Sequence, residues 1–429
     1  MHHKILAFGA LVVASAFCAP ARAEGPPITA QLQQILDNYV AQRAKIEDIT
    51  GVALHVSLGS FGPVIDVSAG NDGLPKPWPL TADSLFEIGS NTKSMTSALI
   101  LMLEAAGKLN INQTVGDWLP QYKAWKSVTI RSLLDMTSDI PSYDETVAMA
   151  EKQLDLHYQF TPEQLIGFVD PDQGNIFPPI TGYYYSNTDY FLAGLIIEKA
   201  SGMSYKEALE RFILKPLDLR DTYYFYGNIP GSVLDRMPAG FYHETGCVQF
   251  QPMPCPTKYP GVLAPLFGKD VRAENMSWAG PAGGVISTLG DLARWYRALF
   301  GLRVIPRAQL DEMETLVSTK TGLRLAIPTQ DDPEGFGLGI IRFYGRDPLL
   351  PSDSSFPPGP YWFYQGGTLG FRVEYAYWPQ YNLVITVAAN SDLPDVDAVY
   401  LQSIPLSSAF TALLNAGAIH DSGAAAANH

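Results

Sequence analysis

The stretch that most constrains the fold is residues 94–106, which has the length of a helix and is apolar on nearly every side. A helix without a polar face is buried, so other elements of the protein must pack around this stretch. The residues directly before it, 86–93, read FEIGSNTK. The sequence therefore predicts a central buried helix with Ser90 and Lys93 at its start.

Ser90 and Lys93 form the only Ser-x-x-Lys in the chain. At the start of a helix their side chains lie on the same face, one turn apart. A serine hydroxyl becomes a nucleophile when a base takes its proton, and a buried lysine with a lowered pKa can be that base or relay. The positive end of the helix also favours the developing alkoxide. The pair predicts a catalytic Ser90 and Lys93, while a serine N-cap beside a solvated lysine is the simpler alternative.

The composition is that of a folded protein that does not bind nucleic acid. The 429 residues, 47% hydrophobic and 17% charged, suit two closely packed lobes. The net charge of −14 repels a phosphate backbone. The histidines and cysteines have neither His-x-x-x-His nor Cys-x-x-Cys spacing, so we expect no metal and no cofactor.

Residues 1–23 have the features of a secretory signal peptide, with a polar start, an apolar run over residues 5–17 and small residues at the end. The apolar run is too short to span a bilayer, so we expect no stable membrane anchor. The sequence predicts a periplasmic or secreted protein. In such an oxidising compartment Cys247 and Cys255 can form a local disulfide, and two free thiols are the alternative.

The order of the predicted elements indicates an α+β fold. A helix over residues 31–46 precedes a hairpin of strands over 52–58 and 63–69, which favours a helix lying across an antiparallel sheet. The sequence from about 94 to 294 reads as a mostly helical lobe inserted between early and late strands. The late elements are strands over 336–344, 361–365, 371–378 and 382–389, then a helix around 396–414. We expect one domain over 24–421, followed by a disordered tail over 422–429.

A second candidate site element is Tyr185-Ser186-Asn187, directly before an apolar helix pattern over residues 191–199. A phenol and an amide so placed can enter the same cleft as Ser90. A cation such as Lys93 nearby favours the phenolate, so Tyr185 is a candidate base. Asn187 is expected to contact Lys93 and a substrate amide. Tyr226-Gly227-Asn228 has the same spacing, but it lies in a Gly/Pro loop with no helix behind it.

The third candidate element, residues 364–371, reads YQGGTLGF where one predicted strand ends and the next begins. Glycines there let a substrate lie against the strand edge, with a backbone N–H free to meet its carbonyl oxygen. Together with the N–H of Ser90, such a group forms an oxyanion hole. A glycine-rich hairpin is the structural alternative.

These three elements, in this order, resemble those of the serine β-lactamase and penicillin-binding protein superfamily, particularly its branch of class C β-lactamases, D,D-peptidases and family VIII esterases. Five further blocks over most of the mature chain look like those of that family: 98–108, 133–141, 185–202, 214–222 and 280–295. The resemblance implies a β-lactamase-like fold, an antiparallel sheet flanked by helices with an inserted helical lobe. It implies that Ser90 forms the acyl-enzyme and that Lys93 and Tyr185 share the proton transfers. It also implies that Asn187 holds the substrate and that the N–H groups of Ser90 and Gly367 bind the oxyanion.

Two departures from the family pattern affect the expected substrate. The third motif of the family usually begins with Lys or His, a residue that helps to recognise a substrate carboxylate, whereas here Tyr364, Gln365 and Gly366 carry no cation. Arg372, a few residues on, is a candidate replacement. The family block Leu-Leu-x-His-Thr-Ser-Gly is LLDMTSD here, over residues 133–139.

The sequence thus predicts an exported serine hydrolase that acts through an acyl-enzyme on a small-molecule or peptide substrate, namely a small ester, a D-amino-acid peptide or a β-lactam. The uncharged third motif favours a neutral ester over substrates with a carboxylate. The alternative is a penicillin- or peptidoglycan-binding sensor on the same scaffold that turns over slowly or not at all.

Overall fold

The computed structural model describes residues 26–59, 62–242, 262–345, 359–392 and 402–420. The expected signal peptide, the tail, and both Cys247 and Cys255 lie outside these residues. Within the described part of the chain, no helix is both long and apolar enough to cross a membrane.

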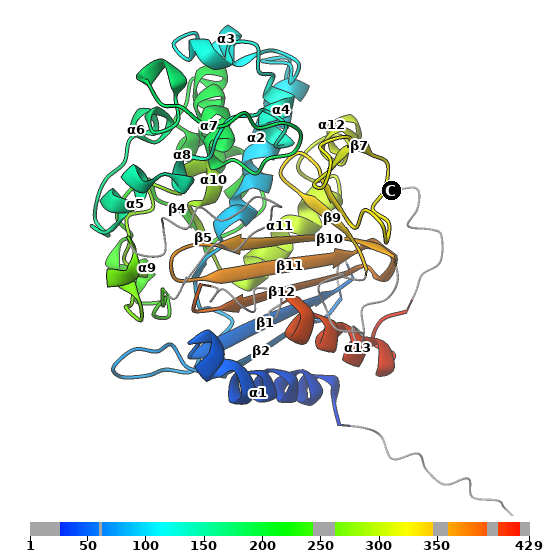
Figure 1. Ribbon diagram of the computed structural model, residues 1–429. Helices are drawn as coiled ribbons and strands as arrows, with labels where there is room; N and C mark the ends of the chain where they lie inside the picture. Colours follow the sequence, from blue (N-terminus) through cyan, green and yellow to red (C-terminus); the bar gives the residue numbers. More distant parts are fainter. Residues whose placement is uncertain (1–25, 60–61, 243–261, 346–358, 393–401, 421–429) are drawn as a thin grey trace, which may run out of the picture.

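An antiparallel sheet forms the centre of the molecule (Figure 1). Its spatial order is β2 (Val64–Gly70), β1 (Gly51–Leu58), β12 (Leu383–Ala389), β11 (Arg372–Trp378), β10 (Pro360–Gly367), β9 (Ile341–Tyr344), β8 (Glu334–Phe336), β6 (Leu316–Ser318) and β7 (Arg324–Leu325). The first and last parts of the sequence meet at its centre, because Val52 on β1 pairs with Ala389 on β12. The middle of the chain is therefore an insertion between strands that pair with each other.

Two layers of helices cover the sheet, one on each face (Figure 1). On one face α1 (Ile28–Glu47) and α13 (Ser407–Asn415) pack against the strand side chains that point to this face, and together they form one hydrophobic core. On the other face α11 (Leu289–Phe300) packs against the sheet, and a larger core extends into the helical lobe.

The helical lobe surrounds α2 (Thr92–Ala105), in which nearly every side chain is buried. Its neighbours are α7 (Asn187–Ser201), α8 (Tyr205–Leu209), α10 (Gly280–Gly283) and α12 (Arg307–Met313). The outer elements of the lobe are α3 (Val115–Trp118), α4 (Ile130–Leu134), α5 (Val147–Gln153), α6 (Pro162–Gly167) and α9 (Gly231–Leu234). The prediction of a central helix enclosed by others is confirmed.

The predicted strand over residues 336–344 is wrong, because the chain reverses within it. Gly337 and Gly339 separate β8 from β9, which pair with each other as a hairpin. Gly339 has φ of +74°, and a Cβ there would lie 2.7 Å from the carbonyl oxygen of Lys93. Only glycine allows the chain to turn this close to α2.

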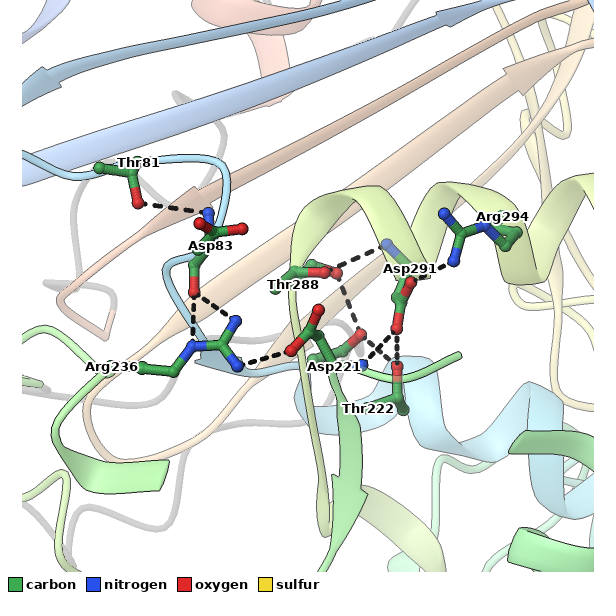
Figure 2. Close-up of polar contacts among 9 residues, drawn as sticks. Thr81, Asp83, Asp221, Thr222, Arg236, Thr288, Asp291 and Arg294 are labelled. Carbon is green, nitrogen blue, oxygen red and sulfur yellow. Dashed lines mark hydrogen bonds and ion pairs between the residues drawn. The ribbon is translucent and has the colours of Figure 1, made fainter. Parts of the chain in front are cut away.

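A small sheet of β3 (Phe86–Glu87), β5 (Val285–Ser287) and β4 (Thr222–Tyr224) lies at the base of α2. Figure 2 shows the polar contacts that hold the chain as it approaches β3: Arg236 donates to the carbonyl oxygen of Asp83 at 2.9 Å and to the Asp221 carboxylate at 2.5 Å. Thr288 caps α11 by accepting from the N–H of Asp291, but the Asp291 carboxylate accepts from the N–H of Asp221 at 2.9 Å. The Asp291 carboxylate therefore joins α11 to β4.

Candidate active site

Ser90 lies in a single 3-10 turn, Gly89–Asn91, between β3 and α2. Gly89 has φ of +50°, and a Cβ there would lie 2.6 Å from the backbone nitrogen of Gly367 on β10. Asn91 fixes the turn, because its buried side-chain amide donates to the carbonyl oxygens of Ile88 and Val373, each at 2.9 Å. Ser90 itself remains partly exposed, next to the end of β10.

The amino group of Lys93 contacts three acceptors and is fully buried. Its Nζ lies 3.0 Å from Ser90 Oγ, 2.6 Å from Asn187 Oδ1 and 2.8 Å from the carbonyl oxygen of Ala282. Burial lowers the pKa of Lys93 to about 7, although nearby Asp144 and Asp189 oppose that shift. A neutral amine has two N–H donors and one lone pair. With Asn187 and Ala282 accepting the two donors, the lone pair of neutral Lys93 is directed to Ser90.

The Tyr185 hydroxyl donates to Ser90 Oγ at 2.7 Å, and its ring lies next to the Lys93 amino group, 4.8 Å from Nζ to the ring centroid. Burial raises the pKa of Tyr185 above its usual value, and the hydrogen bonds with Ser90 and Tyr364 only partly oppose this. The expectation that Lys93 favours a phenolate is wrong for the resting site, because burial disfavours the charged form and Lys93 is not among the groups that lower the pKa of Tyr185. Tyr185 is a proton donor at neutral pH. Tyr226, the alternative, has a buried hydroxyl without a hydrogen-bond partner among the described residues.

Asn187 begins α7, and both ends of its side-chain amide are engaged. Its Oδ1 accepts from Lys93, and its Nδ2 donates to Asp144 Oδ2 at 2.7 Å. Its backbone N–H donates to the Ser142 hydroxyl at 2.8 Å, and that hydroxyl donates to Asp144. The contact with Lys93 was expected. Asp144 uses one of the two N–H donors of Nδ2, and the contact with a substrate amide stays a prediction.

The third element reaches the site through Tyr364 and Gly367. The Tyr364 side chain is 2% exposed, and its hydroxyl lies 3.0 Å from that of Tyr185. A Cβ on Gly366 would lie 1.9 Å from the carbonyl oxygen of Ile88, so glycine is required where β10 passes under the nucleophile turn. Gly367 is exposed beside Gly89, where a backbone N–H can meet a substrate oxygen.

Gln365 and Arg372 belong to the opposite face of the sheet. Side chains alternate along a strand, and Tyr361 and Phe363 pack in the core under α1 and α13, so Gln365 faces that side and away from Ser90. Arg372 is 1% exposed; it pairs with Glu47 at 2.8 Å and donates to the carbonyl oxygen of Ser391. Neither side chain reaches the site, and Arg372 is not a replacement for the missing cation.

The block over residues 133–139 packs behind Tyr185 and Asn187. Met136, which stands where the family has His, accepts from the N–H of Tyr184 through its carbonyl oxygen and contacts the N–H of Ser186 through Sδ at 3.3 Å. Asp139, which stands where the family has Gly, has φ of +61°. The two departures from the family block, Met136 and Asp139, therefore change the residues that pack behind Tyr185 and Asn187, and Asp139 adopts a strained backbone conformation.

Asn91 and Asp144 are contacts of the site that the sequence did not suggest. Asn91 lies inside the Ser-x-x-Lys motif, but nothing in the sequence shows that its amide reaches β11. Asp144 lies in a polar loop far in sequence from Ser90, and only the fold brings it to Asn187.

A model of the Beta-lactamase family matches residues 36–404, which is most of the chain. The chain belongs to the β-lactamase family. Penicillin-binding protein 4* of Bacillus subtilis (strain 168) is 32% identical over 175 residues, 39% of this chain and 36% of that protein. A β-lactamase of Providencia stuartii is 27% identical over 194 residues, 44% of this chain and 47% of that protein. The matched region thus spans less than half of either of these curated relatives.

Solved structures of β-lactamase-like proteins share the fold. A D-stereospecific amidohydrolase from Streptomyces sp. matches with a TM-score of 0.65 and 26% identity over 85% of this chain and 94% of that one. A D-amino acid amidase from Ochrobactrum anthropi SV3 matches with a TM-score of 0.70 and 23% identity over 91% of this chain and all of that one. A class C β-lactamase mutant matches with a TM-score of 0.62 and 18% identity over 90% and 98% of the two chains. The predicted superfamily and the β-lactamase-like α+β fold are confirmed.

Proposed function

We propose that this member of the β-lactamase family is an exported serine hydrolase that cleaves a neutral ester or amide through an acyl-enzyme on Ser90. The observation that carries the proposal is the position of Ser90 Oγ, 3.0 Å from Lys93 Nζ and 2.7 Å from the Tyr185 hydroxyl. A nucleophile between a base and a proton donor is the arrangement that acyl transfer requires.

The protonation states assign the steps. Neutral Lys93 takes the proton of Ser90 as Oγ forms a bond to the substrate carbonyl carbon, and the N–H groups of Ser90 and Gly367 bind the oxyanion. When the bond to the leaving group breaks, the Tyr185 hydroxyl donates its proton to that group. The acyl-enzyme then holds Lys93 as an ammonium and Tyr185 as a phenolate. In deacylation the phenolate takes a proton from the attacking water, and Lys93 returns its proton to Ser90 Oγ as the ester bond breaks.

The substrate class follows from the third motif. Tyr364 places a phenol at the position where a cation would meet a substrate carboxylate, and Arg372 is bound to Glu47 on the other face of the sheet. A charge-assisted hydrogen bond contributes about 1.5–3 kcal/mol, and neither Tyr364 nor Arg372, of the residues that the structure describes, offers one to a carboxylate. Asp144 adds a negative charge close to Asn187. The names of the amidase and amidohydrolase neighbours are consistent with an uncharged amide as well as an ester.

A comparison of kcat/KM on purified protein tests the proposal, with p-nitrophenyl acetate and butyrate, a D-amino acid amide, nitrocefin and a D-alanyl-D-alanine peptide as substrates. We expect steady turnover, with a neutral ester or the amide preferred. A clear preference for nitrocefin or the peptide would contradict the substrate class. Stoichiometric acylation without turnover would instead support a binding or sensing protein.

A further inference from the structure

Two buried carboxyl groups face each other behind the proposed oxyanion hole. Glu87 on β3 is fully buried, and Glu274, in the loop before α10, is 1% exposed. Their side chains are in hydrogen-bonding contact with each other. Glu87 lies three residues before Ser90, and the pair borders residues 368–369, directly after Gly367. The pair therefore lies between the two segments that would supply the oxyanion N–H groups.

The hydrogen-bond donors around the pair are too few for two carboxylates. The Trp278 indole N–H donates to Glu274 Oε2 at 2.6 Å, and the nearby Leu369 N–H lowers the pKa of Glu274. Both oxygens of Glu87 and Oε1 of Glu274 have no hydrogen-bond partner of normal geometry among the described residues. The Thr368 hydroxyl, which also lacks such a partner, lies beside Glu87 and lowers its pKa. An ionised carboxylate only accepts, so two of them cannot bond each other. One proton between them supplies the missing donor.

The electrostatics of the surroundings also favour a retained proton. Burial raises the pKa of Glu87 to about 8, with Thr368 and Glu274 opposing the rise and Asp270 adding to it. Burial and the Glu87 charge raise the pKa of Glu274 well above its usual range. Asp270 is itself paired with Arg272 at 3.3 Å. The Arg272 guanidinium is therefore directed to Asp270. A buried pair of this kind titrates as a unit.

We propose that Glu87 and Glu274 share one proton and thereby hold the turn that carries Gly367 against the segment that carries Ser90. Both are positioning residues, and the inference rests on the proposed function. Glu274 lies beside the Leu369 N–H of this turn, and the backbones of Gly89 and Gly367 approach each other closely. Loss of the proton leaves two buried negative charges at this junction. Their repulsion separates the turn from Ser90, and oxyanion binding is weakened.

Four variants test this proposal. Glu87→Gln and Glu274→Gln keep the side-chain shape and add a permanent N–H donor, whereas Glu87→Ala removes the shape and the donor. Glu374→Gln is the matched control. Glu374 on β11 is fully buried, its carboxylate also lacks donors among the described residues, and burial raises its pKa to about 8. It lies on the opposite face of the sheet. The measurements are kcat and KM for the best ester or amide from pH 5 to 10, and Tm over the same range.

In the wild type we expect kcat to fall above about pH 8 with KM nearly unchanged. Glu87→Gln and Glu274→Gln should lose this alkaline fall, whereas Glu374→Gln should keep it. Glu87→Ala should lower kcat at every pH by on the order of tenfold or more, because small displacements of an oxyanion donor are costly. An alkaline fall that persists in both Gln variants would overturn the positioning role.

The Tm readout is independent of catalysis. The folded-state pKa of Glu87 is above its unfolded value, so its contribution to stability is complete below about pH 4.5 and is lost as the pH rises to about 8. Wild-type Tm should therefore fall over this window, and Glu87→Gln should reduce that fall. An equal fall of Tm with pH in the wild type and in Glu87→Gln would overturn the shared proton. Absence of turnover by the wild type would contradict the proposed function alone, because the Tm comparison needs no substrate.

Discussion

The hydroxyl of Tyr364 lies 3.0 Å from the hydroxyl of Tyr185, so the third motif contacts the proposed proton donor through a neutral phenol. This contact makes a substrate prediction. Tyr364→Lys would bring an ammonium group to the same position, where it can pair with a substrate carboxylate. We expect kcat/KM for a D-alanyl-D-alanine peptide to rise relative to a neutral ester by about tenfold, measured on the same preparations. Arg372→Lys serves as the control, and a ratio that moves equally in both variants would contradict the assignment.

The pKa of Lys93 predicts the acid side of the pH profile. Because Lys93 acts as a base when neutral and burial lowers its pKa to about 7, kcat/KM should rise with pH and level off between about pH 7 and 8, below the alkaline fall expected from Glu87 and Glu274. One pH unit below the pKa, about a tenth of the lysine is neutral, so the rate at pH 6 should be roughly a tenth of the plateau. Ser90→Ala supplies the background rate of ester hydrolysis. A flat profile from pH 5.5 to 7.5 after subtraction would exclude a titrating lysine as the base.

The two Tyr-x-Asn segments give a matched pair of variants. Tyr185→Phe removes the donor to Ser90 and should lower kcat by on the order of 10²–10⁴, the usual range for a positioned acid–base group. Tyr226→Phe removes a buried hydroxyl that has no partner in the described structure, so kcat should stay within about twofold. The measurement is kcat at pH 8. Similar losses in both variants would show that the losses come from packing.

Asp139 provides a prediction for stability. A non-glycine residue at φ of +61° is strained, and Asp139→Gly relieves that strain at the cost of a more flexible unfolded chain. We expect a net gain of about 0.5–1 kcal/mol in the free energy of unfolding, measured by denaturant titration. Asp139→Asn removes the charge and keeps the side-chain shape. An equal gain in the Asn variant would attribute the effect to charge rather than to the backbone.

The sequence predicted most of the fold because its strongest patterns report burial. Residues 94–106 are apolar on nearly every side since α2 is enclosed, and the alternation in the first and last strands reflects a sheet with a separate core on each face. The strand predicted over 336–344 was wrong because Gly337 and Gly339 look like ordinary strand glycines until Met313 packs against the first and α2 against the second.

The sequence identified Ser90, Lys93, Tyr185, Asn187 and Gly367 as neighbours, but their protonation and their remaining partners depend on the tertiary structure. The burial that keeps Tyr185 protonated comes from several elements together, so a motif does not show it. The use of the Asn187 amide by Asp144 and of Arg372 by Glu47 likewise arises from loops and helices distant in sequence. Alternation could have placed Gln365 on the wrong face for catalysis, once Tyr364 was assigned to the site.

The central claim is that Ser90 becomes acylated, and intact-protein mass spectrometry with a fluorophosphonate probe tests it most directly. We predict that the wild type gains one probe adduct, mapped to Ser90 by peptide analysis, and that Ser90→Ala, folded by circular dichroism, gains none. An adduct of equal stoichiometry in Ser90→Ala, or a wild-type adduct mapped to another residue, would contradict the account.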